Sequence, residues 1–142
     1  MDDGYRVEYV EKPESSVWGA IGGGLHDYNI RQAGPDHGQG LCYVLAAADG
    51  SVAGGLLGET HWDWLYITLL WLPEALRGRG HGSQLLALAE EEARRRGARH
   101  AYLDTFSFQA PDFYRRHGYE VFGELEDFPT GHRRYYLRKR LE

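Results

Sequence analysis

A short loop combines two arginines with three glycines directly before a segment patterned as a helix. Backbone N–H groups at a helix start have no intrahelical partner and lie at the positive end of the helix dipole, so they can bind a phosphate. Glycines let the backbone approach such a ligand and permit positive φ angles. We therefore predict a phosphate-binding loop made of Arg77, Gly78, Arg79, Gly80, His81, Gly82 and Ser83.

Other interpretations of this loop fit less well. A P-loop needs a Gly-Lys-Ser/Thr run, and the loop contains no lysine. A dinucleotide-binding fingerprint would use Gly78 and Gly80 after a strand, with Asp104 at the end of the next strand. However, Ser83 replaces the third glycine, and five residues separate the strand from Gly78. The simplest alternative is a glycine-rich surface turn with solvated arginines.

The segments around the loop alternate between strand and helix patterns. An apolar run over 64–72 predicts a buried central strand, and Pro73 ends it. A helix follows from Gly82 to Gly97. The other predicted elements are a strand over 5–10, a helix over 13–34, a hairpin over 41–60, a strand over 100–106, a helix over 110–118 and strands over 119–126 and 133–141.

The helix that starts at Gly82 has two distinct sides. Its predicted apolar side consists of Leu85, Leu86, Ala89 and Ala93. The side expected to face water consists of Glu90, Glu91, Glu92 and residues 94–96. Cys42, the single cysteine, lies in an apolar strand pattern and is expected in the core. The run from Gly131 to Arg134 is interpreted as a turn into the last strand.

This order of elements predicts an α/β (α+β) fold. The strand–helix–strand connection through the loop implies local parallel pairing inside a mixed, mostly antiparallel sheet of about seven strands. The sequence shows no repeat, low-complexity tract or change of composition that would mark a second domain. We therefore expect residues 1–142 to form a single domain.

Composition narrows the class of protein further. The net charge of -5 argues against a general nucleic-acid binder, because such proteins are usually basic. No apolar run approaches the roughly 20 residues that a membrane span needs, and the N-terminus lacks the pattern of a signal peptide. The seven histidines show no metal-ligand spacing, so no metal is expected. A cytoplasmic location is the default expectation.

Two motifs together resemble those of one enzyme family. Arg77-x-x-Gly80-x-Gly82 is similar to the Q/R-x-x-G-x-G/A signature of the GNAT superfamily of N-acetyltransferases. The segment "APDFYRRHGY", which starts at Ala110, resembles the family's A-x-x-[FL]-Y-x-x-x-G-[FY] segment. The resemblance spans nearly the whole chain and implies acetyl-CoA as co-substrate. Many members have an asparagine three residues before this alanine, whereas this chain has Ser107.

The resemblance implies where acetyl-CoA binds. The strand ending at Leu72 would splay from the strand ending near Phe106, and pantetheine would pair in the gap with the backbone of Leu70, Trp71 and Leu72. The loop amides would hold the pyrophosphate, with Ser107, Ala110, Phe113 and Tyr114 contributing further contacts. In the family the tyrosine at position 114 points at the thioester sulfur. A phenol can protonate the leaving thiolate, so Tyr114 is the predicted general acid.

The sequence indicates the general base and the acceptor site less directly than it indicates the acetyl-CoA site. An alkyl amine is mostly protonated at neutral pH and must lose a proton before it attacks. Glu59 and Asp104 are the favoured bases, and His61, Asp63 and Tyr66 are further candidates. Tyr28 and Asn29 end the first predicted helix, which borders the acceptor pocket in the family. We assign Tyr28, Asn29, His61 and Tyr66 to acceptor binding.

The predicted function is transfer of the acetyl group from acetyl-CoA to a primary amine of a small molecule, by direct attack in a ternary complex. Three alternatives stay open: another acyl group, a protein or peptide amine, or a non-catalytic sensor of acyl-CoA. We expect no nucleic-acid or membrane partner, and a homodimer is compatible with the sequence.

Overall fold

The computed structural model describes residues 3–142, which divide into two compact units, residues 3–36 and His37–Glu142. The first unit contains helix α1 (Ser15–Ala33), which confirms the predicted helix and has no buried residue. The predicted strand over 5–10 is wrong: these residues are extended but belong to no strand. The side chains of Tyr5, Val7 and Tyr9 are 85%, 102% and 89% exposed. Alternating polar and apolar residues fit a strand with one buried face. A strand also needs a neighbouring strand with which its backbone can pair, and the alternation does not provide one.

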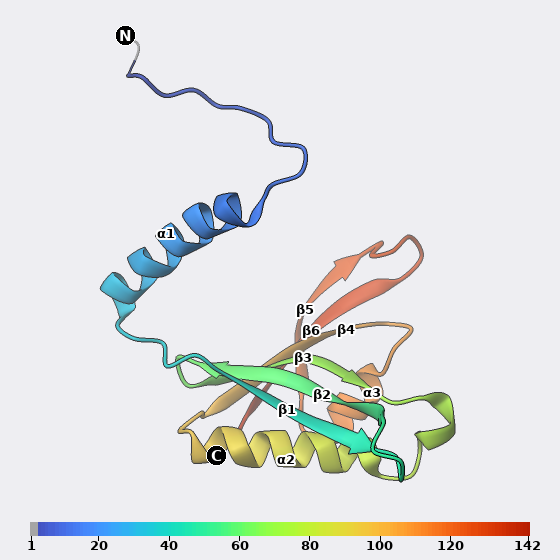
Figure 1. Ribbon diagram of the computed structural model, residues 1–142. Helices are drawn as coiled ribbons and strands as arrows, with labels where there is room; N and C mark the ends of the chain where they lie inside the picture. Colours follow the sequence, from blue (N-terminus) through green and yellow to red (C-terminus); the bar gives the residue numbers. More distant parts are fainter. Residues whose placement is uncertain (1–2) are drawn as a thin grey trace. The chain divides into compact units, whose positions relative to one another are not determined.

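The second unit is built around a six-stranded sheet with the order β1-β2-β3-β4-β6-β5 (Figure 1). Every neighbouring pair is antiparallel except β3 and β4, which are parallel. The sheet is therefore mixed and mostly antiparallel, as predicted, with one strand fewer. Its strands are β1 (Gln39–Ala46), β2 (Val52–His61), β3 (Trp64–Trp71), β4 (His100–Phe106), β5 (Glu120–Glu126) and β6 (Arg133–Arg140).

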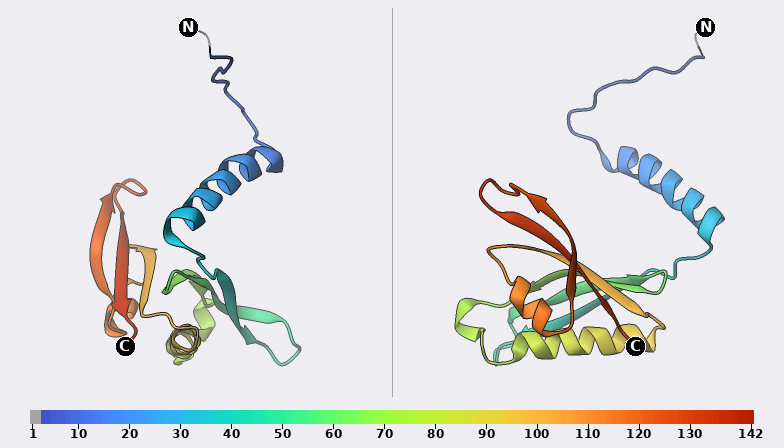
Figure 2. Two further views of the ribbon diagram at one scale, coloured as in Figure 1. Left: turned by 90° about the vertical axis from the view of Figure 1, so that its left-hand side faces the viewer. Right: turned by 180° about the vertical axis from the view of Figure 1, so that it is seen from behind.

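Three helical segments connect the strands of this unit. A short 3-10 turn (Glu74–Leu76) follows β3 and precedes α2 (His81–Arg95), and α3 (Pro111–Arg116) joins β4 to β5. Helix α2 runs along one face of the sheet and contacts β1, β2 and β3 (Figure 2). The predicted apolar side of α2 is confirmed, because Leu85, Leu86, Ala89 and Ala93 are all buried.

One member of the predicted water-facing side of α2 is buried instead. Glu90 accepts hydrogen bonds from the Tyr119 hydroxyl at 2.9 Å and from Lys139 Nζ at 2.8 Å. A charge can be buried where it is paired and hydrogen-bonded, and both partners come from beyond β4 in the sequence. The helical pattern alone could not show them.

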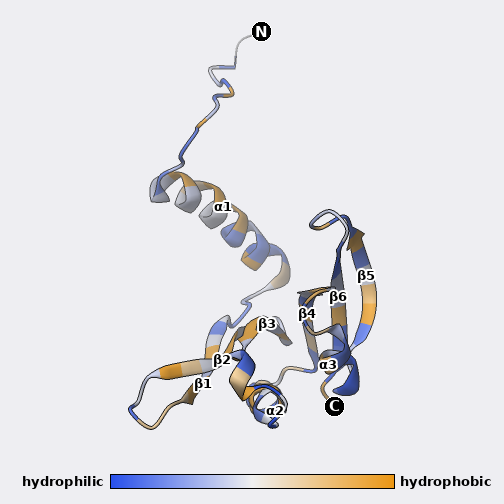
Figure 3. Cartoon of the chain, turned by 90° about the vertical axis from the view of Figure 1, so that its right-hand side faces the viewer, coloured by the Kyte–Doolittle hydropathy of each residue, from blue (hydrophilic) through white to orange (hydrophobic). Residues whose placement is uncertain are grey.

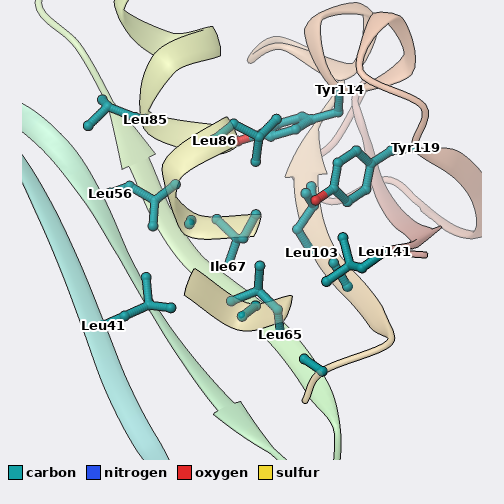
Figure 4. Close-up of a cluster of buried hydrophobic side chains, with 14 of the residues drawn as sticks. Leu41, Leu56, Leu65, Ile67, Leu85, Leu86, Leu103, Tyr114, Tyr119 and Leu141 are labelled. Atoms are coloured by element: carbon teal, nitrogen blue, oxygen red, sulfur yellow. The ribbon is translucent and has the colours of Figure 1, made fainter. Parts of the chain in front are cut away.

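The core lies between α2, α3 and one face of the sheet. Leu65, Ala101, Leu103 and Leu137 carry the sheet side of this core, and Tyr114 and Tyr119 close it beside α3 (Figure 4). Cys42 is exposed, which corrects the expectation that it lies in the core. It lines a shallow apolar hollow on the hairpin of β1 and β2, where apolar residues are concentrated (Figure 3).

Candidate active site

The parallel strands β3 and β4 separate after only three paired positions. Their register pairs residues 64–66 with residues 100–102, and no pair follows Tyr66 and Tyr102. On the other side of β3, Leu57 of β2 pairs with Leu69 while Gly58 pairs with Ile67, so Thr68 is an extra residue. Such a bulge bends a strand and increases its twist. The bulge lies two residues beyond Tyr66, so the bend in β3 coincides with the point where the strands splay.

This splay leaves a length of β3 backbone without a partner on its β4 side. Leu70 and Trp71 still pair with β2 on the other side, and they lie beyond the last pair with β4. The carbonyl oxygen of Leu72 accepts a hydrogen bond from Arg77 Nε at 2.9 Å. The Arg77 side chain therefore ties the loop to the end of the preceding strand segment.

The glycines of the loop have different structural roles. Gly78 and Gly80 have φ angles of 74° and 87°, in the left-handed region that glycine adopts readily. Gly80 is the N-cap of α2, and no side chain caps the first turn of this helix. Gly82 needs no unusual φ. A Cβ atom there would lie 3.3 Å from the ring of Phe113, so Gly82 allows α3 to pack closely on α2.

Other predicted residues of the loop region have partners within the protein. The Ser83 hydroxyl lies 2.9 Å from His117 Nε2, which connects the first turn of α2 to the end of α3. Ser107 Oγ accepts a hydrogen bond from the backbone N–H of Arg133 at 3.0 Å. Ala110 is the N-cap of α3. Sequence reasoning missed His117, whose only signal was its place within the "FYRRHGY" segment.

Tyr114 lies on α3 and is only 7% exposed. Its ring contacts the rings of Phe113 and Tyr119, with centroids 5.1 Å and 5.9 Å apart. Within residues 3–142 its hydroxyl has no hydrogen-bond partner, and it is not closed off from the surface. Burial and, second, the negative charge of Asp104 raise the pKa of Tyr114 to about 12. The phenol is therefore held in its protonated form.

Asp104 belongs to a network at the point where β3 and β4 separate. Its Oδ1 accepts hydrogen bonds from Arg134 Nε at 2.9 Å and Nη2 at 2.6 Å. Its Oδ2 accepts a hydrogen bond from the Tyr66 hydroxyl at 3.2 Å. Burial and the Asp104 carboxylate raise the pKa of Tyr66. Both oxygens of Asp104 are thus engaged, which fits a positioning group better than a proton acceptor.

Arg134 is the residue of this network that sequence reasoning missed. Its guanidinium lies over the rings of Phe106, Phe128 and Tyr136, at 5.3, 5.1 and 5.5 Å from their centroids. Such contacts add attraction to a partly desolvated cation. The sequence suggested only a turn at this position, since its partner Asp104 is 30 residues away.

Glu59 and His61 lie on β2 across from β3. Glu59 is opposite Tyr66 and His61 is opposite Trp64 in the register. The Glu59 side chain is 50% exposed, and its Oε1 lies 3.7 Å from His61 Nδ1. That nitrogen is buried without a hydrogen-bond partner in the described part of the chain. The structure thus brings Glu59, Tyr66 and Asp104 together, with His61 beside Glu59.

Tyr28 and Asn29 belong to α1, in the separate first unit. Their assignment to acceptor binding stays a prediction. In residues 3–142 no three His, Cys, Asp or Glu side chains gather as a metal site would require. None of the helices in this range is long and apolar enough to cross a bilayer.

Comparison with known proteins identifies the fold and the family. The sequence profile of the Acetyltransferase (GNAT) family matches residues 8–119. The chain belongs to the GNAT family of acetyltransferases. It is an acetyltransferase enzyme, and acetyl-CoA is the acetyl donor that the GNAT family uses.

Two curated relatives are similar to this GNAT acetyltransferase. Acetyltransferase Atu2258 from Agrobacterium fabrum is 42% identical over 122 residues, which are 86% of this chain and 89% of that protein. Blasticidin-S acetyltransferase from Streptomyces morookaense is 43% identical over 93 residues, which are 65% of this chain and 68% of that protein.

Solved structures share the fold of this GNAT acetyltransferase. A crystal structure of an acetyltransferase from Agrobacterium tumefaciens has a TM-score of 0.90 and 38% identity, and covers 96% of this chain and 99% of that chain. A streptothricin acetyltransferase from Bacillus anthracis in complex with acetyl coenzyme A has a TM-score of 0.64 and 18% identity. It covers 76% of this chain and 64% of that chain, and at this identity it supports the fold alone.

Proposed function

We propose that this enzyme transfers the acetyl group of acetyl-CoA to a primary amine of a small molecule, by direct attack in a ternary complex. The observation that carries the proposal is the splay of β3 and β4, which leaves the β3 backbone ahead of the glycine loop unpaired on its β4 side, with the Tyr66–Asp104 hydrogen bond where the splay begins. A blasticidin-S acetyltransferase at 43% identity and a nourseothricin acetyltransferase structure at 29% identity support a small-molecule acceptor.

The donor would lie along the separated part of β3. The backbone of Leu70–Leu72 would pair with pantetheine, and the amides of residues 77–83 would hold the pyrophosphate. Two features support this placement: Gly78 and Gly80 have left-handed backbones without a Cβ that would obstruct a ligand, and no side chain caps the first turn of α2. The family match also starts at residue 8 and runs through both units, which supports our proposal that residues 1–142 form one GNAT domain.

The chemical step needs one acid and one base. The amine nitrogen forms a bond to the thioester carbonyl carbon, and the carbon–sulfur bond breaks. Tyr114 gives its proton to the leaving thiolate sulfur. The proton of the new ammonium goes to Glu59, directly or through water, because Glu59 is half-exposed and forms no ion pair with an arginine within residues 3–142. Asp104 accepts the hydrogen bond of the Tyr66 hydroxyl, and burial together with the Asp104 charge keeps Tyr114 protonated.

A pH–rate profile tests this division of roles. The rate should rise with pH through an apparent pKa below that of the free amine, because only the neutral amine attacks. Glu59→Gln should remove or shift this limb without changing the affinity for acetyl-CoA. Asp104→Asn keeps the size of the side chain, and it should lower the rate while retaining the limb. If both profiles overlay the wild-type profile, neither carboxylate is the base, and water or Tyr66 takes that role.

A further inference from the structure

Four aromatic rings form a continuous surface on the face of the sheet opposite the core. We call it the aromatic surface; it consists of Trp64 and Tyr66 of β3 and His100 and Tyr102 of β4. The rings of Trp64 and His100 stack at 4.5 Å, and those of Tyr66 and Tyr102 stack at 4.7 Å. Trp64 also meets Tyr102 edge-on at 5.8 Å. Each of the four side chains remains partly exposed.

The strand register explains why these rings gather there. Trp64 pairs with His100 and Tyr66 with Tyr102, so all four side chains leave the sheet on the same side. Leu65 and Ala101, which lie between them, point the other way and are fully buried. The rings therefore contribute nothing to the core, although aromatic side chains contribute strongly when they are buried there. Ligand sites are commonly lined by aromatic side chains, and these four remain partly exposed outside the core.

The aromatic surface adjoins the proposed reaction centre. Tyr66 and Tyr102 form the last pair before β3 and β4 separate. The Tyr66 hydroxyl binds Asp104, on the side of β4 that leads into the gap. On the other side, the Glu59 carboxylate faces the same surface and acts, after burial, to raise the pKa of Tyr102. The rings thus run from the Glu59 carboxylate to the start of the gap.

We propose that the aromatic surface binds the body of the acceptor, and that the acceptor carries a flat, unsaturated ring beside its amine. A flat ring that stacks on Tyr102 can meet Trp64 edge-on, because these two rings are nearly perpendicular, while its ammonium is attracted to Glu59 and to the aromatic rings. A saturated chain gains only apolar contact there. This inference rests on the proposed function and narrows its substrate class.

The test compares two amines that differ mainly in flatness. Benzylamine and cyclohexylmethylamine have the same number of carbons, and one ring is flat whereas the other is puckered. The specificity constant kcat/KM is measured for each with the full-length enzyme by thiol release from acetyl-CoA, expressed per concentration of neutral amine. We expect benzylamine to be favoured by roughly 3- to 10-fold, the range that an aromatic pair supplies.

Matched variants separate recognition from structure. Tyr102→Leu should remove the preference for benzylamine by lowering its kcat/KM more than that of cyclohexylmethylamine. Tyr9→Leu makes the same change at an exposed position of the first unit and should keep the preference. Equal kcat/KM for both amines in the wild type overturns the inference and leaves the proposed function standing. An equal loss for both amines in Tyr102→Leu also overturns it, because the ring is then structural. Absence of thiol release with either amine and with blasticidin S overturns the proposed function itself.

Discussion

Replacing Tyr114 with phenylalanine is expected to lower kcat by roughly 10²–10⁴-fold, the range that general acid catalysis contributes. The change keeps the ring and its contacts with Phe113 and Tyr119. The hydroxyl has no hydrogen-bond partner within residues 3–142, so its loss should hardly change the free energy of unfolding. The affinity for acetyl-CoA should also be nearly retained. Turnover and thermal unfolding of the purified variant provide both measurements.

Tyr119→Phe is the matched control for this variant. It removes a hydroxyl that binds the buried Glu90, and it should lower the free energy of unfolding by about 1–3 kcal/mol while turnover persists. Burial raises the pKa of Tyr114 to about 12, so the phenol stays protonated through neutral and moderately alkaline pH. Tyr114 should therefore cause no alkaline decline of the rate below that value. A Tyr114→Phe rate within about threefold of wild type, with chemistry limiting in both, would make Tyr114 a packing residue.

Gly80→Asp is expected to weaken acetyl-CoA binding by at least about 100-fold, because a carboxylate near the pyrophosphate adds a repulsion of several kcal/mol. A Cβ there meets no atom within 4 Å, so the cost of a side chain at Gly80 comes from its positive φ of 87° and not from a clash. Its left-handed backbone is one that aspartate and asparagine adopt more readily than most residues. Calorimetric titration with acetyl-CoA gives the affinity of each variant.

Gly80→Asn is the control, because it has the same size and the same backbone preference without the charge. It should bind acetyl-CoA far more tightly than the aspartate variant. Gly82→Asp is a poorer test, since its Cβ would lie 3.3 Å from the Phe113 ring and lost binding could reflect packing. Equal affinities of Gly80→Asp and Gly80→Asn would contradict a pyrophosphate site at this loop. Binding of NADH without binding of acetyl-CoA would favour the dinucleotide interpretation.

Features that depend on residues close together in the sequence could be predicted. The spacing of Gly78, Gly80 and Gly82 indicated the loop, and Asp49-Gly50 indicated the hairpin between β1 and β2. The period of Leu85, Leu86, Ala89 and Ala93 gave the buried side of α2. In each case the signal lies within a short stretch of the sequence, so rules that relate neighbouring residues to local structure were sufficient.

Features that depend on distant partners could not be predicted. The alternation over 5–10 resembles a strand, but a strand exists only where a neighbour pairs with it. Glu90 is charged, and only its contacts with Tyr119 and Lys139 make its burial possible. Asp104 was favoured as a base because the pairing with Arg134, which occupies one of its oxygens, leaves no trace in the local sequence. The bulge at Thr68 has no glycine or proline within β3 to mark it, and the glycine at this point, Gly58, lies on the neighbouring strand β2.

Initial rates of thiol release, measured while acetyl-CoA and blasticidin S are both varied, test the central claim most directly. Direct attack in a ternary complex predicts release that depends on the amine, double-reciprocal lines that intersect, and an N-acetylated product. Benzylamine and a polyamine in the same assay extend the test if blasticidin S is not an acceptor. Parallel lines together with an acetylated enzyme would contradict direct attack. Acetyl-CoA binding without amine-dependent thiol release for any of these amines would contradict the transfer of acetyl groups to small-molecule amines.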